Sequence, residues 1–122
     1  MKLYTKLMMA LEMDERDSSI IQFTNVLAKH YKPDYLYGVH VVPKFDEYYT
    51  SFIQEHWAEF LEKKMSLDEV LKKELETKMD NYFEPDQFVQ ISCEVIEGKP
   101  FKQLIHWADV KNIDLLLSLI HI

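Results

Sequence analysis

The chain has 122 residues, of which 48% are hydrophobic, and a formal net charge of −7. A chain of this length is expected to form one domain, residues 1–122, with a core that needs no disulfide. The negative charge disfavours nucleic acid as a partner, because phosphate recognition requires a basic surface. The single cysteine excludes an internal disulfide, and no apolar run is long enough to span a bilayer or serve as a signal peptide. We therefore expect a cytoplasmic protein without a membrane or nucleic-acid partner.

The first third of the chain reads as strand, helix and strand. Residues 7–11 (LMMAL) are apolar without alternation, which is typical of a parallel strand covered on both faces. Asp14, Asp17 and Ser18 follow and can cap a helix start. That helix has an apolar face made of Ile20, Ile21, Phe23, Thr24, Leu27, Ala28 and Tyr31. Pro33 ends it, and the β-branched and aromatic run YLYGVHVV at 35–42 predicts the next strand.

Residues 44–83 are predicted to be helical, as two helices at about 47–64 and 67–82. Ser66 and Glu69 have the spacing of a capping box at the start of the second helix. The first helix carries an unusually large apolar set, namely Tyr48, Phe52, Ile53, His56, Trp57, Phe60 and Leu61. Two readings of this set stay open: ordinary core packing, or a surface that contacts a protein partner, including a second copy of the chain.

The last third repeats the pattern. Residues 88–96 alternate partly with polar residues, as an edge strand does. Gly98 and Pro100 then introduce a helix whose predicted apolar face is Phe101, Leu104, Ile105 and Ala108. Residues 114–117 (DLLL) predict a central strand covered on both sides. The chain therefore predicts four strands and four helices in an open parallel α/β sheet.

Few residues have the character of a functional site. In open parallel sheets, ligands bind outside the carboxyl ends of the strands, and Glu12 follows the first strand there. Its carboxylate is placed to meet a ligand hydroxyl or amine. Cys93 and His40 fall inside strands and are interpreted as core residues, and His106 as a surface residue. The histidines lack metal-ligand spacing, and no nucleophile elbow or phosphate-binding motif occurs, so we expect no enzyme activity and no metal.

Three segments in order resemble the universal stress protein (UspA) family. They are KLMMALEMDERDS at 6–18, YLYGVHVVP at 35–43 and VIEGKPFKQLIHWADVKNIDLLL at 95–117. The resemblance implies a Rossmann-like sheet of the adenine nucleotide alpha hydrolase type, with strand order 3-2-1-4-5, and often a homodimer. It also implies, for the members that bind ATP, ligand contacts at Glu12, which replaces the family's Asp, at Ala10 and at the backbone of Val41.

The family's phosphate-binding motif, G-x2-G-x9-G-S/T after the fourth strand, is not present. Its first glycine would fall near Leu119, and the sequence ends at Ile122. We interpret the chain as a fragment without the fifth strand, in which 118–122 is not the native continuation, or as a shortened member. ATP binding is then expected of a complete domain and not of this chain. The alternative is a dimerising protein-interaction module of the same fold that binds no nucleotide and contacts partners through 44–83.

Overall fold

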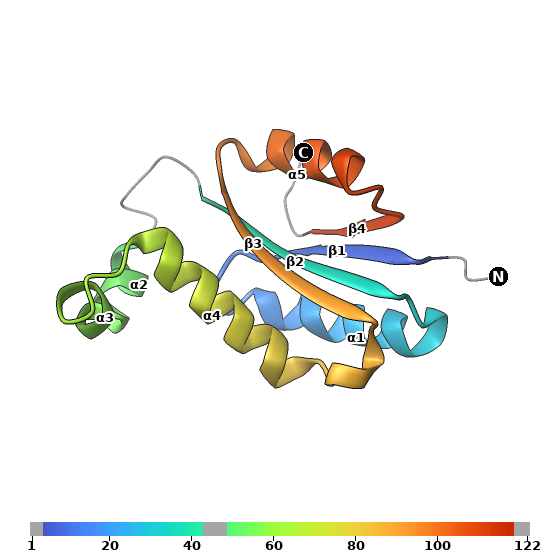
Figure 1. The fold of residues 1–122 in the computed structure, drawn as a ribbon, viewed down its shortest axis with the longest axis horizontal. Coiled ribbons are helices and arrows are strands. Elements are labelled where there is room, and N and C mark those ends of the chain that lie inside the picture. Colours follow the sequence, from blue (N-terminus) through green and yellow to red (C-terminus); the bar gives the residue numbers. More distant parts are fainter. Residues whose placement is uncertain (1–3, 43–48, 119–122) are drawn as a thin grey trace.

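A computed structural model describes residues 4–42 and 49–118. Their strands form one parallel sheet in the order β3-β2-β1-β4 (Figure 1). The strands are β1 (Lys6–Ala10), β2 (Tyr35–Val42), β3 (Gln90–Glu97) and β4 (Leu115–Leu117). This order confirms the Rossmann-like class and the 3-2-1-4 part of the expected topology. No helix in the described residues is long and apolar enough to cross a membrane.

Helices cover both faces of the sheet. They are α1 (Asp17–Tyr31), α4 (Leu67–Tyr82) and α5 (Pro100–Val110). The chain moves outward from β1 to β2 and β3, and then returns across the sheet to β4. Since parallel crossovers are right-handed, this reversal places α1 and α4 on one face and α5 on the other. Figure 1 shows α5 above the sheet and the other two helices below it.

The strand side chains alternate between two cores. Leu7, Met9 and Leu36 are buried against α1 and α4. Met8, Ala10, Val39 and Val41 point the other way, and the buried Leu104 of α5 packs against them. The unbroken apolar run in β1 therefore has the cause inferred from the sequence, because this strand has a helix on either face.

A side chain just before β4 bonds the backbone at the amino end of β1. The Asp114 carboxylate accepts the backbone N–H groups of Thr5 and Lys6 at 2.8 and 2.9 Å. These two hydrogen bonds, from Lys6 first and then Thr5, hold the pKa of Asp114 below its usual value. Within the described residues β4 lies at the edge of the sheet, so its expected central position is not met there.

The prediction of one continuous helix at 47–64 is wrong. Residues 47 and 48 lie outside the described residues, and the remainder forms α2 (Thr50–Glu55) and α3 (Trp57–Leu61). His56 separates them with φ −109° and ψ 25°. Its carbonyl accepts the N–H groups of Glu59 and Phe60, so a new helix starts at this point. The chain thus has five α-helices in the described residues instead of four.

The groups that cap the helix ends differ from the predicted ones. Ser66 does cap α4, since its hydroxyl accepts the N–H of Glu69 at 3.2 Å, but the Glu69 carboxylate bonds the Ser66 hydroxyl. The start of α1 has no side-chain cap, although Asp17 is its first residue. Lys32 ends α1 with a left-handed φ of 49°. The turn expected at 84–86 forms the short helix η2 (Pro85–Gln87).

Some residues assigned to the apolar helix faces are exposed instead. Phe23 is 55% exposed on α1, although Ile20, Ile21 and Thr24 next to it are buried. Phe101 and Ile105 are 44% and 51% exposed on α5. Leu104, Trp107 and Ala108 make the contact of α5 with the sheet. The apolar period identified the helices correctly. On α5, however, it predicted a contact surface that includes Phe101 and Ile105, which are exposed, and omits Trp107, which packs on the sheet.

Candidate functional site

The chain adds strands outward from β1 to β2 and β3, and then returns to place β4 on the other side of β1. Open α/β sheets bind ligands at the carboxyl ends of the strands where the strand order reverses in this way. The loop at 11–16 follows β1 at that edge. Leu11 still continues the ladder, because its N–H donates to the Val39 carbonyl at 2.8 Å. Glu12 is the first residue beyond the sheet. The site described below is built around this loop.

Asp17 fixes the loop from inside. Its carboxylate is 2% exposed and accepts the N–H of Glu12 at 2.7 Å and the N–H of Met13 at 2.9 Å. Met13 has a left-handed φ of 65°, which is unfavourable for a side chain with a Cβ. Lys78 of α4 neutralises the carboxylate with its Nζ at 2.9 Å. The ion pair and the two backbone bonds together hold the loop in one conformation.

His40 connects the same edge to the helical segment. It is 1% exposed, with Nδ1 2.7 Å from the Leu11 carbonyl and Nε2 2.8 Å from the Tyr49 hydroxyl. A carbonyl only accepts, so Nδ1 carries the proton and Nε2 accepts from Tyr49. Burial lowers the pKa of His40 below its usual 6.5. The interpretation of His40 as a packed neutral histidine is confirmed.

A cleft of about 470 Å³ opens beside this loop, between it, α2 and α4. Its acidic lining residues are Glu12, Asp14, Glu15, Glu55 and Glu74. Its two basic groups are already engaged. Lys78 pairs with Asp17, and His56 lies 2.7 Å from Glu59 and 3.8 Å from Glu74. The cleft is therefore strongly negative, with Met13, Tyr49 and Phe52 as its apolar part.

The three predicted ligand-contacting residues do not share one cavity. The Glu12 side chain lines the cleft and is 26% exposed, with one carboxylate oxygen 3.9 Å from Arg16. Arg16 bonds Asp14 more closely, at 2.6 Å, and this bond lowers the pKa of Asp14. The side chains of Ala10 and Val41 are buried under α5, on the opposite face from the cleft. Both residues are also paired in the sheet, Ala10 with Val39 and Val41 with Ile96.

The sequence did not reveal the residues that organise the site. The sequence predicts Asp17 as a helix cap, but its carboxylate accepts the N–H groups of Glu12 and Met13 in the loop instead. Lys78 is 61 residues away along the chain, and nothing in its local pattern indicates a buried ion pair. Tyr49 lay among the aromatic residues of the helical segment and carried no signal of its own. Only the α-helical period of α4 could have indicated that Lys78 borders its buried face.

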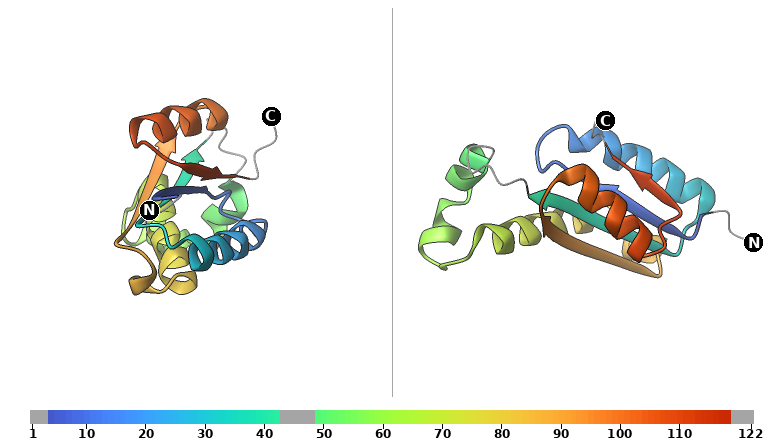
Figure 2. Two further views of the ribbon diagram at one scale, coloured as in Figure 1. Left: turned by 90° about the vertical axis from the view of Figure 1, so that its right-hand side faces the viewer. Right: turned by 90° about the horizontal axis from the view of Figure 1, so that it is seen from above.

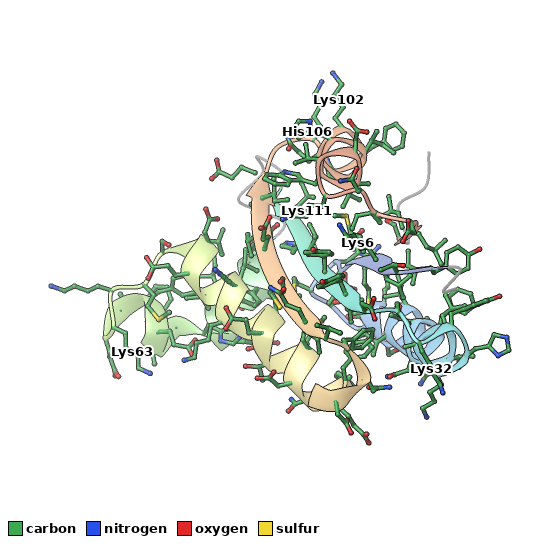
Figure 3. The ribbon with its side chains drawn as sticks, turned by 45° about the vertical axis from the view of Figure 1, so that its right-hand side comes forward. Lys6, Lys32, Lys63, Lys102, His106 and Lys111 are labelled. Carbon is green, nitrogen blue, oxygen red and sulfur yellow. The ribbon has the colours of Figure 1, made fainter. Side chains whose placement is uncertain are left out.

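The described residues provide no other reactive centre. Cys93 lies in β3, and burial raises the pKa of its thiol to about 11, so it stays protonated and weakly nucleophilic. His106 is exposed on α5, as expected, and Figure 3 shows it on the outer side of the helix. Within residues 4–42 and 49–118 there is no group of three or more His, Cys, Asp or Glu side chains that could hold a metal ion.

These features define an open parallel α/β domain of the Rossmann-like class with a loop-built cleft at the carboxyl edge. No family model and no curated protein sequence matches the chain. Solved structures do match. The universal stress protein UspA of Lactobacillus plantarum superposes with a TM-score of 0.64 and 16% identity, over 93% of this chain and 74% of that chain.

Two further universal stress proteins match with similar scores. A protein of this family from Burkholderia pseudomallei has a TM-score of 0.58 and 18% identity, over 95% of this chain and 81% of that one. A universal stress protein in complex with cAMP has a TM-score of 0.59 and 14% identity, over 93% and 75%. The chain therefore has the universal stress protein fold, and the resemblance seen in the sequence is confirmed at the level of the fold.

Proposed function

We propose that the chain is a non-catalytic stress-response module of the universal stress protein type. We further propose that it holds the nucleoside part of an adenine nucleotide at the carboxyl edge of β1. The fold and the neighbour that is in complex with cAMP support the proposal. The observation that carries it is Glu12, which stands at the sheet's switch point with its backbone fixed by Asp17 and its carboxylate in the cleft.

The geometry suits a ligand with hydroxyl or amine donors. A carboxylate accepts hydrogen bonds from a ribose or from an exocyclic amine. Asp17, buried and paired with the partly exposed Lys78, fixes the loop before any ligand arrives, and this reduces the ordering entropy that binding must overcome. The apolar part of the cleft, at Met13, Tyr49 and Phe52, provides surface for a planar ring.

The charge of the cleft selects among adenine ligands. Its carboxylates repel phosphate, and its basic groups are engaged with other residues. We therefore propose that adenosine and cAMP, with at most one phosphate charge, bind better than ATP.

The same observations favour a second candidate. A module of this fold that binds no nucleotide and acts only through protein contacts would equally tolerate an acidic cleft. The two candidates differ in one measurable property, which is whether an adenine ligand binds at all.

The test is a titration of the full chain with adenosine, cAMP and ATP, followed by calorimetry and by backbone amide shifts. We expect adenosine and cAMP to shift the Glu12 and Met13 amides, with ATP weaker. Glu12→Gln should weaken binding about tenfold. Glu76→Gln, an exposed change on α4 outside the cleft lining, should have no effect. If neither adenosine nor cAMP binds at concentrations up to about 10 mM, the interaction module is the better description.

A further inference from the structure

Strand β3 forms one edge of the sheet, since within residues 4–42 and 49–118 it pairs only with β2. In the right-hand view of Figure 2, β3 is the outermost strand. It has eight residues without a proline, and all eight pair in sequence with β2, so no bulge interrupts it. Proteins often protect a sheet edge by keeping it short, bulged or interrupted by proline. The edge at β3 has none of these three protections.

The hydrogen bonds at the two ends of β3 establish which of its backbone groups face outward. The N–H of Gln90 donates to the Asp34 carbonyl at 3.2 Å. The N–H of Gly98 donates to the Val42 carbonyl at 3.1 Å. Because successive backbone groups of a strand point in opposite directions, the even-numbered residues between these two also bond β2. The N–H and C=O groups of the odd-numbered residues within 91–97 therefore point away from β2, where an added strand can bond them.

A groove of about 370 Å³ opens at this edge, with α4 on one face of the sheet and α5 on the other. Its lining residues are Asp68, Glu69 and Lys72 of α4, Glu94, Val95 and Ile96 of β3, and Trp107 of α5. An added strand in this groove would lie between two helices. Its side chains would point alternately toward α4 and toward α5, because side chains alternate along a strand.

The α4 side of the groove is acidic. Asp68 and Glu69 are exposed there and outnumber Lys72. Farther along α4, the carboxylate of Asp80 adds to burial in raising the pKa of the Cys93 thiol, so negative charge continues beside the strand. Side chains of an added strand that point toward α4 therefore favour positive charge.

The α5 side of the groove is largely apolar. Trp107 and Ile96 pack in the same core cluster and are only partly buried. Glu94 also lines the groove, and Lys111 lies 3.4 Å from its carboxylate, so its charge is largely neutralised. Side chains of an added strand that point toward α5 therefore favour apolar groups.

We infer that the outer edge of β3 binds an extended segment of another protein, in which basic side chains facing α4 alternate with apolar side chains facing Trp107. The backbone of the segment adds one strand to the sheet, and its side chains provide the specificity. The β3 edge of a second copy fits poorly, because β3 carries Glu94 and Glu97 and no basic residue. The inference does not depend on nucleotide binding, since the groove shares no lining residue with the cleft beside loop 11–16.

The test uses the full chain and a synthetic peptide that alternates lysine and valine, followed by backbone amide shifts and hydrogen exchange. We expect the peptide to protect the outward-facing amides of Cys93 and Val95. The amides of Ser92 and Glu94 bond β2 and should change much less. A peptide that alternates glutamate and valine should bind at least about tenfold more weakly.

Backbone methylation tests the strand pairing itself. Methylating the lysine–valine peptide on alternate nitrogens gives two further probes, one for each set of residues. Only one set of its N–H groups faces β3, so one methylated peptide should lose binding and the other should keep it. A peptide held by charge alone would show no such difference.

A charge reversal tests the α4 side of the groove. Asp68→Lys should weaken the lysine–valine peptide by about tenfold. The matched control is Asp109→Lys, which reverses an exposed aspartate on α5 about half a turn round the helix from Trp107, and it should keep the affinity. Circular dichroism of each variant establishes that it is folded.

Three results overturn the inference. The first is no binding of the lysine–valine peptide up to about 1 mM. The second is equal binding of the glutamate peptide, of both methylated peptides, or by the two charge-reversal variants. The third is protection of the Cys93 and Val95 amides that rises with the concentration of the chain alone, which assigns the edge to a second copy.

Discussion

The hydroxyl of Tyr49 lies 2.8 Å from Nε2 of His40, and the two side chains are 2% and 1% exposed. Because Nδ1 of the same imidazole bonds the Leu11 carbonyl, one histidine joins the ends of β1 and β2 to Tyr49, the residue that precedes α2. Both ring nitrogens are satisfied away from water, and a change to either partner leaves an unpaired buried group. The junction is therefore sensitive to both mutation and protonation.

Tyr49→Phe should lower the free energy of unfolding by about 2 kcal/mol, because Nε2 of His40, which is only 1% exposed, loses its donor. Urea denaturation followed by circular dichroism measures the change. The control is Tyr82→Phe, where the side chain is 57% exposed, and this should have almost no effect. Equal losses in the two variants would contradict the role assigned to the hydrogen bond.

Acid should destabilise the fold through His40. Burial lowers its pKa in the folded state below the usual 6.5, while the unfolded chain titrates near that value. The hydrogen bond to the Leu11 carbonyl acts against this lowering of the pKa, as do the carboxylates of Glu12 and Asp17, and Lys78 acts with it. As the pH falls below 6.5, the unfolded state takes up a proton before the folded state does, so stability decreases.

The loss through His40 ends once the pH is below the folded-state pKa. Urea denaturation at a series of pH values measures the slope, and nuclear magnetic resonance of the His40 ring measures the titration itself. His40→Gln should flatten the slope between pH 6.5 and the folded-state pKa, although it lowers stability throughout. A His40 ring that titrates above 6.5 would refute the prediction.

Asp17→Ala should lower the free energy of unfolding by about 3 kcal/mol, because it leaves Lys78 unpaired and frees two loop amides. Asp17→Ala with Lys78→Met should recover part of the loss. The control is Asp14→Ala, which removes an exposed pair with Arg16 and should change stability by less than about 1 kcal/mol. Thermal and urea unfolding measure all three, and the prediction fails if the two aspartates are equivalent.

Lys32→Gly should stabilise the protein by about 1 kcal/mol, since Lys32 ends α1 in the left-handed region, where glycine has no Cβ clash. Lys29→Gly is the matched comparison, an exposed lysine inside the same helix, and it should destabilise by about 1 kcal/mol. Opposite signs in urea denaturation support the reading of the helix end. A loss at both positions would show that the Lys32 side chain contributes more than its backbone strain.

The sheet could be predicted from the sequence because its signal is local. The run at 7–11 is apolar on consecutive positions, as in a strand covered on both faces, and 35–42 is rich in β-branched and aromatic residues. Their order, with helices between them, then fixed a parallel topology. The corresponding strands begin within one residue of the expected positions.

The site could not be predicted to the same extent, because its contacts are not local. The Asp17–Lys78 pair joins residues that only the packing of α4 beside α1 brings together. No glycine or proline marks the break between α2 and α3 at His56. The side chain of His56 there bonds the Glu59 carboxylate, which the sequence does not indicate. Helical periodicity also left the contact surface of α5 ambiguous, since Ile105 and Ala108 both border Leu104 on the helix. The ligand contacts of Glu12, Ala10 and Val41 remain predictions.

The strand β1 has a kinetic consequence for how the chain folds. It pairs with β2 on one side, and on the other side Leu7–Met9 pair with Leu115–Leu117, near the opposite end of the sequence. Parallel pairing across such a separation closes a very large loop before it gains any hydrogen bonds, and non-local pairing of this kind is slow. During synthesis, β1 therefore keeps one edge unpaired until Leu115–Leu117 have emerged. We expect the Asp114 bonds to Thr5 and Lys6 to form last and to release first when the protein unfolds.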